Sequence, residues 1–250
     1  MNSKIFIIAH KQFKCPAIKN YSPLLVGNKD FDIEGAYKDD IGENIADKNA
    51  NYCELTGLYW IWKNYNGHEK YIGLVHYRRY FSSTDIFGNS AFFLKDKKIQ
   101  NILSNNDCIL PRPLKLNTTV AKNYYQNGDG RLKDLKTTER IIKKIYPNYL
   151  REYREVLNSK EASYCNMMIM SRKYFDDYCK WLFNVLFHVE MQTDLTGYSK
   201  SEKRIYGYLS EILLNVWVKK NNLQVRYMPV IFTEESDFKR FKSLIYKMLN

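Results

Sequence analysis

Two arginines and a histidine directly follow a short apolar run in the sequence YIGLVHYRRYF at residues 71–81. The run at residues 72–75 is typical of a buried strand, and His76, Arg78 and Arg79 come at its carboxyl end. In open α/β sheets, ligands bind just beyond the carboxyl ends of strands. Guanidinium groups there would match phosphate oxygens, so these three residues predict an anion-binding site. The alternative is that the arginines form surface ion pairs with nearby carboxylates.

Metal chemistry has a weaker basis in this sequence. Asp30 and Asp32 have the D-x-D spacing that can hold a divalent cation through hard oxygen ligands. Because the pair follows Gly27-Asn28-Lys29 rather than an apolar strand, we interpret it as a solvated turn. The four histidines lack the spacing of a zinc site. We therefore assign no metal ligand and predict no cofactor, while a divalent cation that accompanies a substrate stays open.

Strands that alternate with helices predict an α/β domain with a mainly parallel sheet. Residues 115–131 are polar, aromatic and glycine-containing, which suits a loop over a site. We expect one domain over residues 1–237 and a basic amphipathic helix at residues 238–250. The expected strands cover residues 4–9, 21–26, 71–75, 107–110, 166–170 and 225–232, and the expected helices cover residues 51–64, 96–103, 137–146, 149–157, 174–189 and 202–219.

Composition narrows the class of partner. The chain has 250 residues and a formal net charge of +12, which favours anionic ligands. It has no zinc-finger spacing, helix-turn-helix signal or RNA-binding aromatic motif, so we expect no nucleic acid partner. The five cysteines are odd in number and contain no C-x-x-C pair, which indicates reduced thiols in a cytoplasmic protein.

Three blocks of the sequence resemble one bacterial family. Its members are capsular and exopolysaccharide biosynthesis glycosyltransferases, long catalogued as a domain of unknown function. The blocks are DIGENIADKN at residues 40–49, YCELTGLYWIWKN at residues 52–64 and GLVHYRRYF at residues 73–81. Further similarity at residues 166–170, 175–183 and 204–211 extends the likeness over nearly the whole chain. The resemblance implies a GT-A-like, Rossmann-related fold and a nucleotide-sugar-dependent hexosyltransferase, with UDP-galactose as the donor that the family suggests.

In such an enzyme, His76, Arg78 and Arg79 would bind the donor diphosphate. Fixed positive charge there would stabilise the departing nucleotide diphosphate much as a metal ion does. His10 and Lys11, at the carboxyl end of the first expected strand, would meet the nucleoside or the diphosphate. An equally simple interpretation is that these two residues end the strand through ordinary hydrogen bonds.

Four polar residues precede the helix that contains the second block. Asp40, Asn44, Lys48 and Asn49 could line the sugar and nucleoside pocket. Asn44 could equally cap the following helix. Glu54 falls within that helix and is interpreted as a residue of its exposed face.

Transfer of a sugar to a hydroxyl with inversion needs a carboxylate near the anomeric carbon, because the hydroxyl must lose its proton. Glu211 and Asp194 are our candidates. We favour Glu211, because helical spacing places it on roughly one face with Arg204 and Gly207. The competing interpretation is a buried Arg204–Glu211 ion pair that supports the fold.

The C-terminal segment at residues 238–250 combines an apolar stripe with cations. Such a helix can lie on an anionic membrane surface, which would suit a lipid-linked saccharide acceptor at the inner leaflet of the cytoplasmic membrane. It could also pack on the enzyme's own core.

Two other functions compete with glycosyl transfer. A glycoside hydrolase would need two facing carboxylates at a defined separation. A basic, non-enzymatic module would bind nucleic acid or an anionic polymer without turnover.

Overall fold

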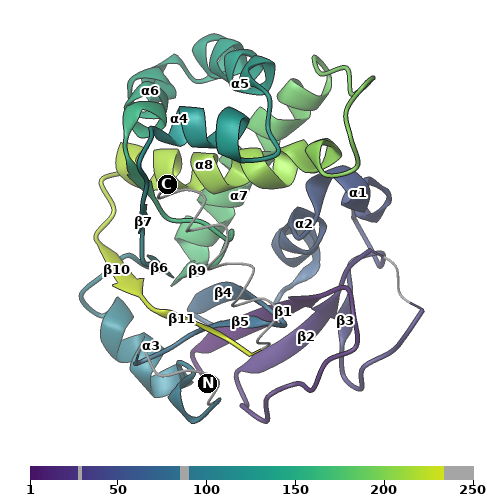
Figure 1. Ribbon diagram of the computed structural model, residues 1–250. Helices are drawn as coiled ribbons and strands as arrows, with labels where there is room; N and C mark the ends of the chain where they lie inside the picture. The colour runs from purple at the N-terminus through teal and green to yellow at the C-terminus, as the bar shows by residue number, and fades with distance from the viewer. Residues whose placement is uncertain (28–29, 85–89, 234–250) are drawn as a thin grey trace.

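The computed structural model of the chain describes residues 1–27, 30–84 and 90–233. Within these residues, nine strands form one sheet that lies between a thick layer of helices and a thinner layer around α3 (Figure 1). No helix in the described part of the chain is long and apolar enough to cross a membrane. The segment at residues 238–250, for which a basic amphipathic helix is predicted, lies outside the described residues.

The sheet has the strand order β10-β6-β9-β4-β1-β2-β3. β1 pairs in parallel with β2 and β4, β2 with β3, and β6 with β10, whereas β9 runs antiparallel between β4 and β6. β5 pairs antiparallel with β4, and β11 with β5. The strands of this sheet are β1 (Ser3–Ala9), β2 (Tyr21–Leu25), β3 (Tyr37–Lys38), β4 (Tyr71–His76), β5 (Arg79–Phe81), β6 (Cys108–Pro111), β9 (Met168–Ser171), β10 (Val225–Met228) and β11 (Val230–Phe232), and β7 (Leu114–Lys115) pairs separately with β8 (Glu161–Ala162).

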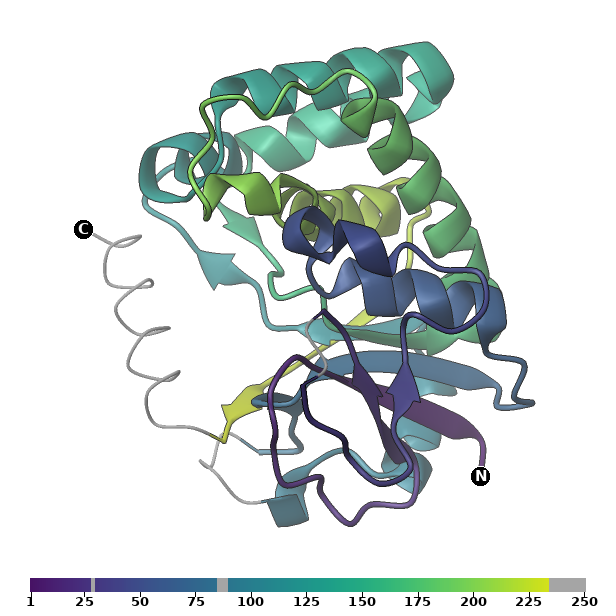
Figure 2. The ribbon, with the colours of Figure 1, turned by 90° about the vertical axis from the view of Figure 1, so that its right-hand side faces the viewer.

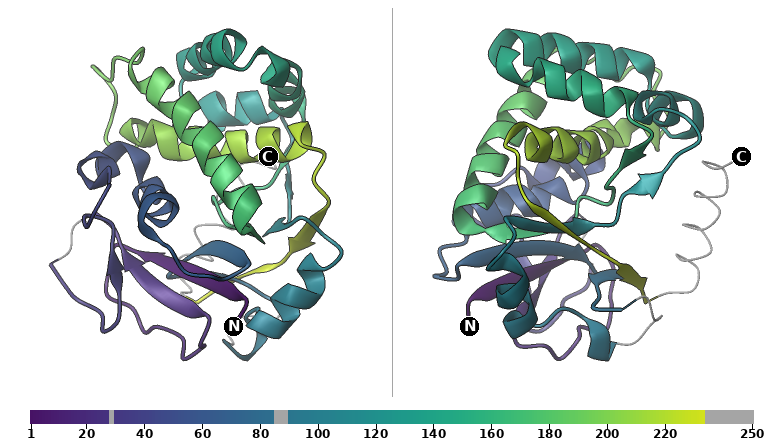
Figure 3. Two further views of the ribbon diagram at one scale, coloured as in Figure 1. Left: turned by 180° about the vertical axis from the view of Figure 1, so that it is seen from behind. Right: turned by 90° about the vertical axis from the view of Figure 1, so that its left-hand side faces the viewer.

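The helices form layers on the two faces of the sheet. α2, α7 and α8 cover one face, α3 covers the other, and α5 and α6 pack on α7 and α8 as an outer layer (Figures 1 and 3). The helices are α1 (Asn49–Tyr52), α2 (Leu55–Asn64), α3 (Asp96–Leu103), α4 (Val120–Lys122), α5 (Leu132–Ile145), α6 (Leu150–Asn158), α7 (Arg172–Glu190) and α8 (Ile205–Lys220), with short helical turns η1 (Ala46–Lys48), η2 (Ser90–Phe92), η3 (Asn123–Asn127), η4 (Pro147–Tyr149) and η5 (Glu202–Arg204).

Alternation along β1 divides the core in two. Phe6 and Ile8 point into the core under α2, α7 and α8, whereas Ile5, Ile7 and Ala9 point into the core on the α3 side. Because successive side chains of a strand face opposite sides, a sheet covered on both faces needs a continuous apolar strand. The predicted α/β architecture with a mainly parallel sheet is therefore confirmed.

Several predicted boundaries were wrong. The helix expected over residues 51–64 is two helices, because the backbone turns at Cys53, which has a φ of 53° and separates α1 from α2. The strand expected over residues 225–232 is likewise two strands, β10 and β11. Residues 115–131 contain α4 and the π-helical segment η3, so they are not a plain loop. In each case tertiary contacts select a local geometry that periodicity does not reveal.

Close packing of α2 on the sheet depends on Gly57. A Cβ atom at this position would lie 2.6 Å from Cδ1 of Ile8, 3.0 Å from Cγ1 of Val26 and 3.2 Å from Cδ2 of Leu24. We expect Gly57→Ala to lower the free energy of unfolding by about 1–3 kcal/mol through overpacking. Urea denaturation measures this effect.

Gly207→Ala is the matched control for that substitution. It also adds a Cβ atom to a helix, but the nearest atoms belong to Cys53 at 3.4 Å, an ordinary contact. This variant should be neutral, or more stable by up to about 1 kcal/mol because alanine favours helix. Equal stabilities for Gly57→Ala and the parent would show that α2 can shift without cost.

Candidate functional site

The carboxyl ends of β1 and β4 lie side by side, because the two strands are parallel and pair as far as Ile8 and His76. The turn after β4 presents Tyr77 and Arg78. The His10 ring stands edge-on to the Tyr77 ring with 5.3 Å between centroids, and the Arg78 guanidinium lies 4.8 Å from the same ring centroid. The structure thus gathers His10 and Arg78 at one sheet edge. Lys11 follows as an exposed residue.

Both histidines at this edge have lowered pKa values. Burial is the main cause of the lowered pKa of His10, and the positive charge of Arg78 adds to it. For His76, burial again dominates, opposed by the negative charge of Glu54. The Nε2 atom of His76 lies 2.6 Å from the carbonyl oxygen of Cys165. This contact connects the end of β4 to the segment before β9.

Arg79 points toward the same segment. Its charge acts on the Cys165 thiol, and its guanidinium lies 5.7 Å from the centroid of the Phe232 ring. Burial raises the pKa of that thiol to about 11, and the charge of Arg79 opposes the rise. Arg79 is thus held by strand β11 and by the Cys165 segment, within electrostatic range of Glu211.

Glu211 reaches this region from α8. Its Oε1 atom accepts a hydrogen bond of 2.8 Å from the backbone N–H of Cys165. Burial and, to a smaller extent, the negative charge of Glu54 raise the pKa of Glu211 to about 7, against the opposing effects of the Cys165 N–H and the charges of Arg79 and Arg204. A carboxyl group with such a pKa can exchange a proton near neutral pH.

The competing Arg204–Glu211 ion pair is wrong. Both side chains belong to the described part of the chain, where no ion pair joins them. Arg204 instead donates a hydrogen bond of 3.1 Å from Nε to Sγ of Cys53 and lies 5.3 Å from the Tyr208 ring centroid. Arg204 therefore affects Glu211 only through its charge, whereas Glu211 is held by the backbone of Cys165.

Glu54 is the second carboxylate of this region, and it is not a simple surface residue. Its Oε1 atom accepts a hydrogen bond of 2.7 Å from Nδ2 of Asn166. The same Nδ2 donates to the carbonyl oxygen of Gly207 at 3.0 Å, and Oδ1 of Asn166 accepts from the Ser210 hydroxyl at 2.9 Å. One buried amide therefore links Glu54 to the first turns of α8, the helix that carries Glu211. We call His76, Arg78, Arg79, Glu54 and Glu211 the β4-end site.

The backbone around the β4-end site is strained. Cys53, Cys165 and Asn166 have φ values of 53°, 81° and 49°. Positive φ is uncommon outside glycine and costs about 1–3 kcal/mol for each residue. Such strain persists where the surrounding structure fixes it, often at functional sites. Cys53 directly precedes Glu54, the N–H of Cys165 binds Glu211, and the side chain of Asn166 binds Glu54. The strained residues therefore position both carboxylates.

The structure uses three of the four predicted pocket residues for local support. Asn44 accepts a hydrogen bond of 3.1 Å from the N–H of Ala46, but the N-cap of the following turn η1 is Ile45, so the alternative role of Asn44 as a helix cap was wrong. Lys48 forms an ion pair with Glu190 at 2.7 Å. Asn49 donates to the carbonyl oxygen of Cys53 at 2.9 Å and to the Thr56 hydroxyl at 3.0 Å. A sugar-binding role for these residues stays a prediction.

The two remaining predicted residues are exposed. Asp40 lies in the turn before η1. Asp194 lies in the connection between α7 and η5, where its Oδ1 atom accepts a hydrogen bond of 2.8 Å from the N–H of Thr196. The Thr196 side chain and backbone lower the pKa of Asp194, and Lys133 of α5 contributes. A carboxylate with a lowered pKa is a poor proton acceptor, so Glu211 is the better candidate base.

Nothing in the sequence pattern identified the contacts that build this site. Glu54 and Asn166 are 112 positions apart, and Cys165 and Glu211 are 46 apart. Within the described residues, no group of three or more histidine, cysteine, aspartate or glutamate side chains is placed to hold a metal ion.

Known structures resemble this fold. The apo structure of the bifunctional glycosyltransferase WbbM superposes with a TM-score of 0.84 and 27% sequence identity over 94% of this chain. This chain spans 46% of the length of that WbbM chain. The match confirms the GT-A-like fold class predicted from the sequence.

Two fungal structures match more weakly. Core-mannan synthase A from Aspergillus fumigatus, in its Mn/GDP form, has a TM-score of 0.38 and 11% identity over 92% of this chain and 74% of its own. The mannosyltransferase Ktr4p from S. cerevisiae has a TM-score of 0.37 and 9% identity over 93% and 70%. These scores are too low to support a conclusion about this chain.

No curated protein sequence matches this chain. A family model does match, over residues 4–222, which is most of the chain. Its description is "Domain of unknown function (DUF4422)", and the chain belongs to that family.

Proposed function

We propose that this chain is a glycosyltransferase that moves a hexose from a nucleotide-diphosphate donor to a saccharide hydroxyl. One observation supports this most directly. At the carboxyl end of β4, Arg79 lies within electrostatic range of the half-buried carboxyl of Glu211, and Arg78 lies in the turn between β4 and β5. The likeness to WbbM, a glycosyltransferase, supports the same reaction class. The proposed donor is UDP-linked, with galactose as the first candidate sugar.

The proposed reaction divides the roles within the β4-end site. Glu211 accepts the proton of the acceptor hydroxyl. At the same time the oxygen of that hydroxyl forms a bond to the anomeric carbon of the donor sugar. The bond between that carbon and the donor diphosphate breaks, and its electron pair leaves with the diphosphate. Arg78 and Arg79 stabilise the charge that develops on the leaving group. Glu54 raises the proton affinity of Glu211 by its charge, so it acts as a positioning and tuning residue.

The proposed acceptor is a growing capsular, exopolysaccharide or O-antigen chain, carried on a lipid. The resemblance noted in the sequence supports it, as does the net charge of +12, which suits a phosphorylated carrier. A cytoplasmic location next to the inner membrane face belongs to the same proposal.

A donor screen tests the proposal. We expect calorimetric binding of UDP and of one UDP-hexose, and release of UDP that depends on an added saccharide acceptor. Activity should be retained in chelator, because the two arginines supply the positive charge. Failure of every nucleotide sugar in a panel of UDP, GDP, dTDP and CMP donors would refute the transferase.

Activity assays also distinguish a transferase from the alternative, a glycoside hydrolase. Glu54 and Glu211 are two carboxylates within electrostatic range of one another, which a hydrolase would also need. A hydrolase would cleave aryl glycosides without any nucleotide, whereas a transferase would leave them intact.

A further inference from the structure

Helix α5 carries a row of cations along one face. Lys133, Lys136, Arg140, Lys143 and Lys144 are all exposed. Their spacings of three, four, three and one residues place them within about 100° of arc at 100° per residue. The opposite face of the helix is buried, and its apolar side chains are those of Leu135, Ile141 and Ile142. We call the five exposed cations the α5 cationic face.

In the described part of the chain the charges of this face form no ion pairs with acids, and Asp194 lies within electrostatic range of Lys133. The two acids of α5 are engaged elsewhere: Asp134 is buried against Tyr124 and Tyr198, and Glu139 pairs with Arg154 of α6 at 2.6 Å. The α5 cationic face is therefore a concentration of positive charge that no ion pair among the described residues neutralises.

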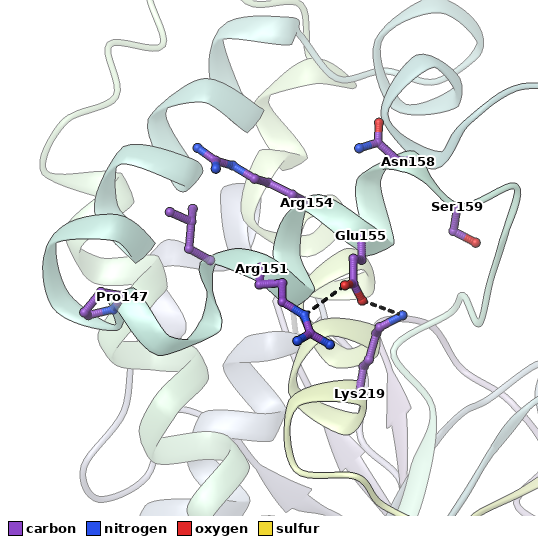
Figure 4. Close-up of a pocket in the computed structure, with 8 residues that line it drawn as sticks. Pro147, Arg151, Arg154, Glu155, Asn158, Ser159 and Lys219 are labelled. Atoms are coloured by element: carbon purple, nitrogen blue, oxygen red, sulfur yellow. Dashed lines mark hydrogen bonds and ion pairs between the residues drawn. The ribbon is translucent and has the colours of Figure 1, made fainter.

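The neighbouring helices α6 and α8 also carry cations, but theirs form ion pairs with acids. A surface pocket of about 680 Å³ between α6 and α8 is also basic, but Glu155 lies between its cations and bonds to two of them (Figure 4). The distances are 3.0 Å to Arg151 and 2.9 Å to Lys219. Ion pairing thus reduces the positive charge of this pocket, whereas the five cations of the α5 cationic face form no ion pair among the described residues.

The position of α5 suits a flat partner. α5 lies in the outermost helical layer, on the far side of α7 and α8 from the sheet (Figures 1 and 2). A helix of 14 residues is about 21 Å long, so the row of cations can meet many headgroups at once. Leu132, 43% exposed, begins the helix beside this face.

We infer that the α5 cationic face binds the surface of a membrane that contains anionic phospholipid. Anionic leaflets attract clustered lysine and arginine side chains within about one Debye length of the surface. The inference does not depend on the proposed glycosyl transfer, because vesicle binding is measured without donor or acceptor.

Vesicle sedimentation tests this inference. The probes are vesicles of phosphatidylcholine alone and of phosphatidylcholine mixed with phosphatidylglycerol. We expect the full chain to bind only the mixed vesicles, and salt to weaken the binding. Replacement of all five cations of the α5 cationic face by glutamine should weaken binding to mixed vesicles at least about tenfold.

A charge-matched variant provides the control. Five exposed lysines on the α3 side of the sheet are replaced by glutamine: Lys14, Lys19, Lys95, Lys97 and Lys98. This variant loses the same net charge and keeps residues 238–250, so we expect it to bind mixed vesicles nearly as well as the parent. Circular dichroism verifies that both variants are folded. If the fivefold variant unfolds, Lys136→Glu with Lys143→Glu, compared with Lys95→Glu and Lys98→Glu, makes the same comparison.

Three results would overturn the inference. They are equal loss of binding in the two variants, undiminished binding in the α5 variant, and absence of vesicle binding by the parent chain. Binding of an anionic polysaccharide through α5, without vesicle binding, would assign this face to a polymer instead.

Discussion

Replacing Glu211 with glutamine is expected to reduce kcat by about 10²–10⁴-fold, the usual contribution of a general base. The KM for the donor should change little. Glutamine retains an oxygen that can accept the hydrogen bond from the N–H of Cys165, so the geometry is preserved while the proton acceptor is lost. Single-turnover transfer from the donor identified by the screen is the measurement.

The control variants for this prediction are Asp194→Asn and Glu54→Gln. Asp194→Asn should be nearly as active as the parent, because its partners are Thr196 and Lys133 rather than the β4-end site. Glu54→Gln should lower the pKa of Glu211 by removing a negative charge, and hence shift the pH profile. Full activity of Glu211→Gln, or a larger loss in Asp194→Asn, would contradict the assignment.

The pKa of Glu211 fixes the direction in which kcat/KM and the free energy of unfolding should change with pH. Since Glu211 must be deprotonated to act as a base, kcat/KM should rise with pH and level off above about 7. Folding raises the pKa of this carboxyl from 4.5 to about 7, so its contribution to the free energy of unfolding falls as the pH rises through that interval. Glu211→Gln should remove both the kinetic inflection and this part of the stability change.

Loss of Arg78 is expected to have the second large effect. Arg78→Ala should lower kcat/KM by about 10²–10³-fold, since it removes a charge directed at the leaving diphosphate. Donor affinity should also fall, because a hydrogen bond to a charged group is worth about 1.5–3 kcal/mol. Calorimetry with UDP, together with transfer kinetics, separates the two contributions.

Two further variants sharpen this test. Arg226→Ala removes an equal charge from an exposed position on β10, at the opposite end of the sheet from β2 and β3, and should leave transfer unchanged. Arg79→Lys keeps the positive charge near Cys165 but loses the planar guanidinium, so this variant should retain the fold and lose activity. Near-normal kinetics in Arg78→Ala would show that its guanidinium serves the Tyr77 contact alone.

Local patterns predicted the frame of this site well. The strand before His76 was expected from a short apolar run that stops at charged residues, and β4 lies there. Periodicity also indicated that α7 and α8 are helices. These features depend on residues close together in the chain, which is why a single sequence contains them.

Local sequence patterns did not predict the contacts between segments that are distant in the chain. Glu54 has the spacing of a helical surface residue, yet the turn at Cys53 and the amide of Asn166 bring it into the site. Arg204 and Glu211 share a helix face, yet Arg204 bonds to Cys53. Partner choice depends on which segments the sheet order places together, and residue spacing carries no information about that order.

The amino-acid sequence by itself determined an α/β domain, a cationic strand end and a net charge of +12, because strand and helix periods and charge are local or additive properties. Only the tertiary structure decided that Glu211 lies half-buried near a second carboxylate, with a pKa of about 7. It also decided that the α5 cationic face forms no ion pair among the described residues, while Arg151 and Arg154 of α6 pair with acids. Burial and pairing depend on distances between segments that are remote in the chain, and folding alone sets those distances.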